Sequence, residues 1–531
     1  MNPALRMITL ALCAMFFVSG AAGLVFETLW FQQAGLAFGN SVWASSLVLA
    51  GYMGGLAFGN SLGARFADRP ANPLRVYAWL EILVGVTGVL LVLFLPSLSA
   101  ILAPLRGVFE AQPLFLNGLR FTTAFVVLAL PSTAMGATLP LVSRALASHD
   151  ENFGRVLGVL YASNTFGAVA GVLVTEIALI EAFGIRGAAI SAAGLNFLAA
   201  VMALRISPSL LAPSPMTAEA TPKTVLSTGS AWASGGRRLL IAAFLAGMCL
   251  LALEVVWLRA LLLFLNDTPM CFAVILAAVL VGIASGGYLG SAWFSYAPDA
   301  DRFAVLVAYA AGLAGVLGFS AMPLVLENFW QLRQGPGVVI AVAVPLVLVV
   351  SIASGLLFTL LGVALKKTGG STAATSGRLT FANTLGAAVG PLLGGFVLLP
   401  TLGVEGSLLV LCSGYGVIGL ILASRPSTPP RDRYGAALLF FAGLAFFPFG
   451  MGDELVRTSA RKWMGGDAEI VEVREGLTGT LIHVQHRLHG LPLSRQLATN
   501  AYSMSSTDFI SRRYMQLYVY LPLALHPGMD R

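Results

Sequence analysis

One stretch of this sequence occurs twice, and this duplication restricts the possible folds of the chain more than any other feature. Residues 20–88 return as residues 247–315 without a gap, at a constant offset of 227. The matched pairs keep both residue type and spacing: Gly20 with Gly247, Glu27 with Glu254, Trp30 with Trp257, Gly55 with Gly282, Gly59 with Gly286, and Gly63 with Gly290. A register held over this length indicates an internal repeat, so two halves of the same fold are expected.

The match continues further along the chain at an offset of 219, so the second copy has lost eight residues. In this block Asn164 returns as Asn383, and Gly184 returns as Gly403. The deletion falls near the third and fourth apolar runs of the copy, where a loop is expected. The duplicated unit is therefore larger than a local motif.

The composition predicts a membrane protein. Hydrophobic residues make up 57% of the chain and charged residues only 10%, whereas soluble domains contain about 25% charged residues. Apolar runs of about 20 residues recur, which is the length that spans a bilayer as a helix. All four cysteines lie in such runs and are expected to pack there rather than form disulfides or bind metal: Cys13, Cys249, Cys271 and Cys412. The lipid bilayer is the first expected partner.

The apolar runs divide the sequence into five parts. Six runs lie in residues 1–206 and six in residues 237–425, joined by a polar linker at 207–236. One more run follows at 434–451, and residues 452–531 form a polar tail. Because each copy has an even number of spans, the copies should lie parallel, related by an axis along the membrane normal. The predicted fold is an all-α polytopic membrane protein of two parallel six-helix repeats, with a thirteenth span.

Lysine and arginine residues predict the orientation. With the N-terminus in the cytoplasm, seventeen of them fall in inner segments and five in outer loops, as expected for a multi-pass protein of the inner (plasma) membrane. The thirteenth span then carries the tail outside. Alternation of polar and apolar residues in the tail predicts short antiparallel strands, followed by a helix over Ser511–Leu525.

Several segments resemble a known family. They are SGAAGLVFETLW at 19–30, GYMGGLAFGNSLGARFADR at 51–69, YASNTFGAVAG at 161–171, and the tail segments at 473–484 and 497–527. They resemble the spermidine synthase-like membrane proteins, which join a twelve-span, major facilitator-like module to an aminopropyltransferase domain. The tail is similar to the N-terminal β segment of that domain.

The resemblance implies an aminopropyltransferase that uses decarboxylated S-adenosylmethionine, with Asp508, Tyr514 and Gln516 near its amine substrate. In the family, the Gly-rich cofactor loop and the catalytic Asp lie beyond the point where this sequence ends, at Arg531. The resemblance therefore implies an enzyme that is catalytically incomplete, with no catalytic, cofactor-binding or metal residue of its own. On this resemblance the chain is a natural gene split, a frameshifted relative, or a module whose methyltransferase-like partner chain is encoded separately. Nothing in the sequence indicates nucleic-acid binding.

Carboxylates inside the predicted spans are the main candidates for a membrane site. Ionisable residues there are costly and usually functional. Glu27 and Glu254 form a repeat-related pair, which predicts either a site for a cation, a proton or an amine, or two interfacial residues, one of which could pair with Arg259. Glu81 has no acidic counterpart, because Ala308 takes its place. It is a candidate single site or, alternatively, a hydrogen-bonded structural residue.

Other repeat-related residues allow two interpretations. Asn164 and Asn383 either line a central cavity or hydrogen-bond one helix to another. Trp30 and Trp257 are expected at the membrane interface. The glycines spaced by four at 55–63 and 282–290 are expected to let helices pack closely. The segment from Gly63 to Arg69 is similar to the major facilitator loop motif between the second and third spans.

These observations lead to two hypotheses of different functional class and to a third, weaker one. The first is an integral-membrane, spermidine synthase-like protein that lacks its nucleoside-binding domain. The alternative is a secondary transporter or exporter of a small cationic metabolite such as a polyamine, which the carboxylates favour. The third is a scaffold without turnover.

Overall fold

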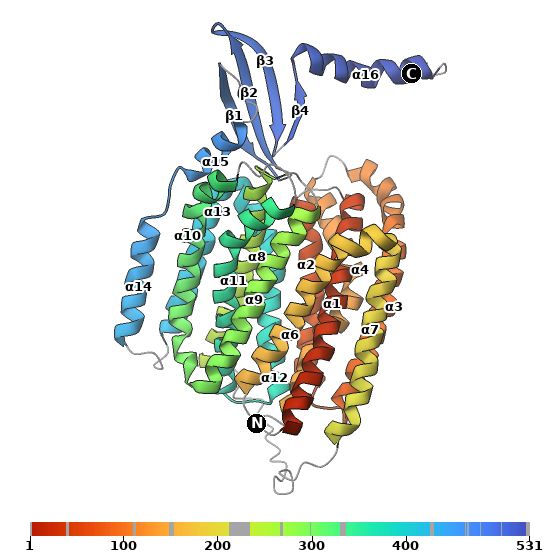
Figure 1. The fold of residues 1–531 in the computed structure, drawn as a ribbon, viewed down its shortest axis with the longest axis vertical. Coiled ribbons are helices and arrows are strands. Elements are labelled where there is room, and N and C mark those ends of the chain that lie inside the picture. The colour runs from red at the N-terminus through yellow and green to blue at the C-terminus, as the bar shows by residue number, and fades with distance from the viewer. Residues whose placement is uncertain are drawn as a thin grey trace.

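The computed structural model describes residues 3–38, 42–109, 113–147, 153–211, 234–265, 269–297, 299–329, 336–424, 430–461, 464, 467–477, 479–500 and 502–526. Most of the predicted linker, residues 212–233, lies outside these ranges. The chain forms a helical bundle with a small sheet at the end opposite the N-terminus (Figure 1).

The first half of the bundle contains seven α-helices and a π-helical turn: α1 (Pro3–Phe38), α2 (Val42–Phe66), α3 (Pro73–Phe109), α4 (Pro113–Gly136), α5 (Thr138–Ala147), α6 (Phe153–Val174), η1 (Thr175–Leu179) and α7 (Ile180–Leu211). The second half has the same order except that one helix replaces α4 and α5 and a 3₁₀ turn is added: α8 (Ser234–Leu262), α9 (Pro269–Tyr296), η2 (Ala300–Phe303), α10 (Ala304–Phe329), α11 (Pro336–Lys366), α12 (Thr372–Leu392), η3 (Leu393–Leu398) and α13 (Leu399–Ala423). Many of these helices begin with proline, whose fixed φ suits the first helical position.

The described residues contain nine helical segments that are long and apolar enough to cross a membrane. Two of them, Gly154–Ser207 and Thr372–Ala423, have 54 and 52 residues, enough for two crossings each. Each is divided at the same place in the repeat by a π-helical turn and a glycine with positive φ, Gly184 at 66° and Gly403 at 63°. Residues with a side chain rarely adopt this backbone conformation, so glycine sets the boundary between the paired spans.

Helix packing follows the repeat. Within the first half α1 packs against α6, α2 against α4, and α3 against α7. The equivalent pairs of the second half are α8 with α12, α9 with α11, and α10 with α13. Two further interfaces join the halves, α2 with α12 and α6 with α9. The prediction of two structurally similar six-helix repeats is therefore confirmed.

Glycine allows the closest of these approaches. A Cβ atom added to Gly20 on α1 would lie 2.0 Å from the carbonyl oxygen of Asn164 on α6. A Cβ atom added to Gly247 on α8 would likewise lie 2.0 Å from the carbonyl oxygen of Asn383 on α12. Real Cβ contacts are never this short, so the glycines bring the two asparagines next to the innermost helices.

The remaining elements leave the bundle. Helix α14 (Pro430–Ala445) packs against α10 and returns the chain to the end where the sheet lies (Figure 1). There follow α15 (Met451–Ala460), β1 (Ala468–Glu475), β2 (Thr480–Leu488), β3 (Leu491–Thr499), β4 (Tyr502–Ser506) and α16 (Phe509–Leu525). The strands form an antiparallel sheet in chain order. The predicted β-rich segment is thus confirmed.

The sheet is attached to the second half of the bundle. Ile482, Val484 and Ala498 of the sheet are buried together with Leu263 and Val456. Helix α16 projects sideways from the sheet, and none of its residues is buried (Figure 1).

Candidate functional site

A cavity of about 230 Å³ lies between the two halves, in the middle of the bundle. Most of its wall consists of residues that the repeat relates to one another. The pairs include Gly20 and Gly247, Glu27 and Glu254, Tyr52 and Val279, Gly136 and Gly355, Tyr161 and Thr380, Asn164 and Asn383, Thr165 and Thr384, and Ala168 and Ala387. The cavity therefore lies on the pseudo-twofold axis of the repeat. In membrane proteins with internal repeats, substrate sites lie at this interface near the bilayer midplane.

Two carboxyl groups enter this cavity from opposite halves. Glu27 of α1 is 5% exposed and Glu254 of α8 is 3% exposed. Both carboxylate oxygens of Glu254 lack a hydrogen-bond partner among the described residues. The two groups are close enough to repel each other when both are ionised. No lysine, arginine or histidine is found among the described residues that line the cavity.

A buried carboxylate without a partner is costly, so the pair requires a proton or a cation. The pairing of one of these carboxylates with Arg259, which the sequence left open, is not formed, because Arg259 is engaged elsewhere. Its guanidinium is fully buried and donates to the carbonyl oxygens of Gly476 and Leu477, at 2.8 and 2.9 Å. Its Nη1 also lies 3.6 Å from Oε2 of Glu475. Arg259 therefore secures the turn between β1 and β2 to the end of α8.

The interpretation of Trp30 and Trp257 as interfacial residues is wrong. Both side chains are at most 1% exposed. Trp30 stacks on Phe26 with ring centroids 5.5 Å apart, and Trp257 meets Phe319 edge-on at 6.4 Å. These rings belong to the buried apolar clusters of the bundle. The sequence pattern of a tryptophan near a span end cannot distinguish this position from a lipid interface.

Asn164 and Asn383 line the cavity, and the close approach of their helices to Gly20 and Gly247 explains why. Their amides supply both donors and acceptors beside the carboxylates. Several polar or aromatic lining residues were missed at the sequence level, among them Tyr52, Asn60, Tyr161 and Thr380. The repeat gave no signal for Tyr52 and Tyr161, because Val279 and Thr380 occupy the equivalent positions.

Glu81 lies outside the cavity wall. It is 1% exposed on α3 and accepts a hydrogen bond from the Ser19 hydroxyl at 2.6 Å. Its second oxygen accepts from the Asn196 amide at 3.1 Å. Ser19 itself lines the cavity, so Glu81 is one side chain removed from it.

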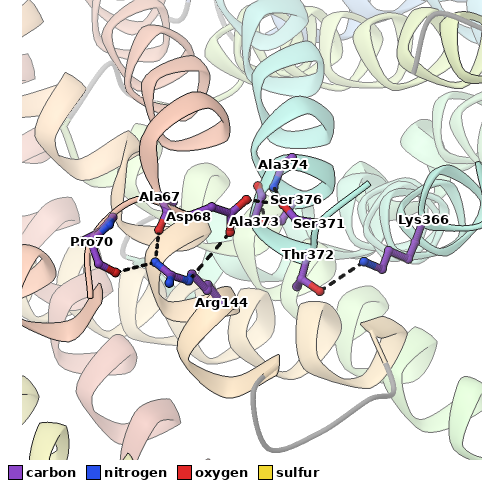
Figure 2. Close-up of polar contacts among 10 residues, drawn as sticks. All are labelled: Ala67, Asp68, Pro70, Arg144, Lys366, Ser371, Thr372, Ala373, Ala374 and Ser376. Carbon is purple, nitrogen blue, oxygen red and sulfur yellow. Dashed lines mark hydrogen bonds and ion pairs between the residues drawn. The ribbon is translucent and has the colours of Figure 1, made fainter. Parts of the chain in front are cut away.

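A polar cluster joins the halves at the end of the bundle where the N-terminus lies. Figure 2 shows Asp68, after α2, accepting a hydrogen bond from the Ser371 hydroxyl at the start of α12. Arg144 of α5 donates to the carbonyl oxygens of Ala67 and Pro70, at 2.6 and 2.8 Å, and its Nε lies 3.8 Å from Asp68. The residues that resembled a loop motif thus connect the two halves.

Further contacts between the halves lie toward the N-terminal end of the bundle and toward the sheet. Toward the N-terminal end, the Thr380 hydroxyl donates to Asn60 at 2.8 Å. Toward the sheet, Phe31 of α1 stacks on Phe272 of α9, with ring centroids 4.1 Å apart and an interplanar angle of 3°. The cavity is therefore bounded at both ends by contacts between the halves.

The tail residues assigned through the family resemblance are not brought to this cavity. Asp508 caps α16 by accepting from the Ser511 amide at 3.0 Å. Hydrogen bonds from Ser506 and Ser511 hold the pKa of Asp508 below its usual range. Tyr514 and Gln516 are exposed on α16, and the Tyr514 hydroxyl contacts that of Tyr518. No group of three potential metal ligands is found in the part of the chain that the structure describes.

Comparison with known proteins finds similarity in structure alone. No family model matches the sequence, and no curated protein does. The human organic anion transporter MFSD10 matches 80% of this chain and 100% of its own, at 14% identity and a TM-score of 0.50. The fucose:proton symporter of E. coli matches 79% of this chain and 98% of its own, at 15% identity and a TM-score of 0.48. The nucleoside transporter NupG matches 84% of this chain and 100% of its own, at 14% identity and a TM-score of 0.46.

These findings give the chain a major facilitator-like fold and correct the family assignment. The resemblance to spermidine synthase-like membrane proteins is wrong, because the solved structure that carries the likeness in fold is that of a transporter, MFSD10. The catalytically incomplete aminopropyltransferase is wrong for the same reason. The membrane segments on which the assignment rested are glycine-rich helix-packing segments, which this bundle uses for close contacts between helices.

Proposed function

We propose that the protein is a secondary transporter that moves a small organic cation across the membrane by alternating access of the central cavity. The observation that carries this proposal is the pair of buried carboxyl groups, Glu27 and Glu254, in a cavity without a cationic side chain among the described residues. A positively charged substrate would pair with both groups at once. A negatively charged substrate would meet only repulsion.

The contacts between the halves support the alternating-access part of the proposal. The cluster at Asp68, Arg144 and Ser371 closes one end, and the stack of Phe31 on Phe272 closes the other. Each contact joins the two repeats, so a rocking motion of one half against the other would break one while it keeps the other. This is the motion expected of paired repeats around a fixed site.

We also infer that the protein lies in the plasma membrane with its N-terminus in the cytoplasm. The excess of lysine and arginine on that side supports this orientation. The sheet would then lie outside, together with α16.

The first test is equilibrium binding of cationic probes to the purified full chain in detergent. Spermidine and tetraethylammonium serve as cationic probes, and fucose and glutarate as neutral and anionic ones. A hydrogen bond from an ammonium group of spermidine to a carboxylate contributes about 1.5–3 kcal/mol, and 1.4 kcal/mol corresponds to a tenfold change in affinity; tetraethylammonium has no N–H donor and tests the attraction between charges alone. Glu27→Gln and Glu254→Gln are therefore each expected to weaken cation binding by about tenfold or more.

Glu176→Gln is the matched control, because Glu176 is a partly buried carboxylate near the end of a span that already accepts a hydrogen bond from Gln32 and does not line the cavity. It should leave binding unchanged. Binding of glutarate but not of the cations, or cation binding that survives in the double variant of Glu27 and Glu254, would refute the proposal.

A further inference from the structure

The first half contains a polar cluster that the second half lacks. In the first half the carboxyl group of Glu81 is surrounded by Ser19, Tyr77 and Asn196. At the repeat-related positions the second half has apolar or aromatic side chains: Ala246 for Ser19, Ala304 for Tyr77, Ala308 for Glu81, and Tyr415 for Asn196. All four of these are buried. The same packing arrangement is thus achieved without a carboxyl group, so the fold itself does not require one at Glu81.

Burying this polar cluster is energetically unfavourable. Glu81 has no ion pair among the described residues, and Tyr77 is the titratable side chain beside it. The facing side chains from α1 and α7, Ser19 and Asn196, are uncharged. Oδ1 of Asn196 has no hydrogen-bond partner in the described part of the chain. Each unsatisfied buried polar group costs about 1–3 kcal/mol, and a buried carboxylate without a cation costs more.

The geometry suits a carboxyl group that exists in two protonation states. When Glu81 is ionised, Ser19 and Asn196 each donate to one of its oxygens. When it is protonated, its O–H can donate to the Ser19 hydroxyl oxygen, which lies 2.6 Å from Oε1 and can also act as an acceptor. The cluster therefore holds partners for both forms.

Ser19 connects this cluster to the cavity. Its hydroxyl lies 2.6 Å from Oε1 of Glu81 and forms part of the cavity wall. A hydroxyl can accept one proton while it releases its own. A proton could thus pass between the Glu81 carboxyl and water in the cavity while the serine ends the exchange unchanged.

We propose that Glu81 is a proton-binding site, separate from the Glu27 and Glu254 pair, that exchanges its proton with the cavity through Ser19 and couples transport to the proton gradient. The coupling rests on the proposed transport function, whereas the protonation change at Glu81 does not. Because the second half has no equivalent cluster, the coupling site belongs to one repeat alone. The two sites have different ligands: the carboxylate pair takes the organic cation, and Glu81 takes a proton.

The first experiment measures transport in proteoliposomes that contain the full chain, with radiolabelled tetraethylammonium as the probe. Two modes are compared: accumulation driven by an imposed pH gradient, and exchange of labelled for unlabelled probe without a gradient. Glu81→Gln is expected to reduce gradient-driven accumulation at least tenfold while exchange continues. Ser19→Ala should slow accumulation in the same way, and Glu176→Gln is the control that should change neither mode.

A structural role would give a different result. If Glu81 only stabilised the packing of α3, Glu81→Gln and Glu81→Ala, which copies the second half, would each lose both modes together; if Glu81 is the proton site, both variants lose gradient-driven accumulation and keep exchange. Glu81→Asp retains the proton site and should recover part of the gradient-driven accumulation. Accumulation at the wild-type level in Glu81→Gln would overturn the proposal.

A second measurement is independent of transport. The carbonyl stretch of a protonated carboxylic acid is followed by infrared spectroscopy across pH in protein with isotope-labelled glutamate. Glu81→Gln is expected to remove one titrating band that remains in Glu27→Gln. If no probe is transported by any variant, the proposed function fails, and this titration still decides whether Glu81 changes its protonation state. Spectra of wild type and Glu81→Gln that coincide at every pH would refute the proton site.

Discussion

Arg259 should hold the external sheet to the second half of the bundle, and Arg259→Met tests this directly. The guanidinium is fully buried at the end of α8. It donates to two carbonyl oxygens of the turn between β1 and β2 and lies beside Glu475. Methionine preserves much of the aliphatic volume and removes the charge with both hydrogen bonds.

The expected loss follows from these contacts. Two hydrogen bonds from a charged donor contribute about 1.5–3 kcal/mol each, so about 3–6 kcal/mol of the docking free energy should be lost. Removing one partner of a buried ion pair costs about 3–5 kcal/mol, because the other charge is left uncompensated. Both arguments predict that the sheet detaches locally while the bundle stays folded.

The pH dependence provides a signature for this mechanism. Burial raises the pKa of Glu475 above its ordinary value of 4.5, and Arg259 partly opposes this. A raised folded-state pKa means that the contribution of Glu475 to docking is full below pH 4.5 and is lost as the pH rises through the folded-state pKa. Without Arg259 that pKa should rise further, so the variant should detach at neutral pH and regain docking as the pH falls.

Hydrogen exchange of the amides in β1 and β2 is the appropriate assay, measured in detergent at several pH values. The wild-type chain should protect these amides, and Arg259→Met should lose most of that protection at neutral pH. Glu475→Gln in the same background should restore part of it, since a neutral side chain needs no cation. Equal protection in wild type and Arg259→Met, or a loss that does not vary with pH, would refute the reasoning.

Two more substitutions test the packing and the contact between the halves. Gly247→Val places a side chain where a Cβ atom would already lie 2.0 Å from a carbonyl oxygen of α12. This variant should therefore lose the monodisperse peak in size-exclusion chromatography. Gly194→Ala is the control, because nothing lies within 4 Å of a Cβ atom at this helical position, and it should keep that peak. Asp68→Asn weakens a half-exposed ion pair and the hydrogen bond from Ser371, together about 1–2 kcal/mol, which is about a 5–30-fold shift in a two-state equilibrium. In Asp68→Asn, a cysteine introduced into the cavity should accordingly be labelled faster from the N-terminal side. Asp432→Asn, at an exposed position on that side, should leave the labelling rate unchanged. An unaltered labelling rate in Asp68→Asn would contradict a closing role for Asp68.

The sequence predicted the elements well, because the repeat and the apolar runs depend on local chemistry. Helix-forming apolar runs must satisfy their backbone hydrogen bonds internally in a bilayer, so their length identifies the spans. The alternation in the tail likewise predicted the sheet, whose β2–β3 turn has positive φ at His489 and Gly490. The family assignment failed because glycine-rich packing motifs report how closely helices approach and not which reaction a protein performs.

For the site, the sequence by itself determined which residues are repeat-related, and therefore that Glu27 and Glu254 would occupy equivalent places. Only the tertiary structure decided that those places face each other, because the distance between two helices depends on how both halves pack across α2 with α12 and α6 with α9. It also placed Trp30 in the interior and separated Glu81 from the cavity by a single serine. Burial and facing are properties of several helices at once, and no single segment encodes them.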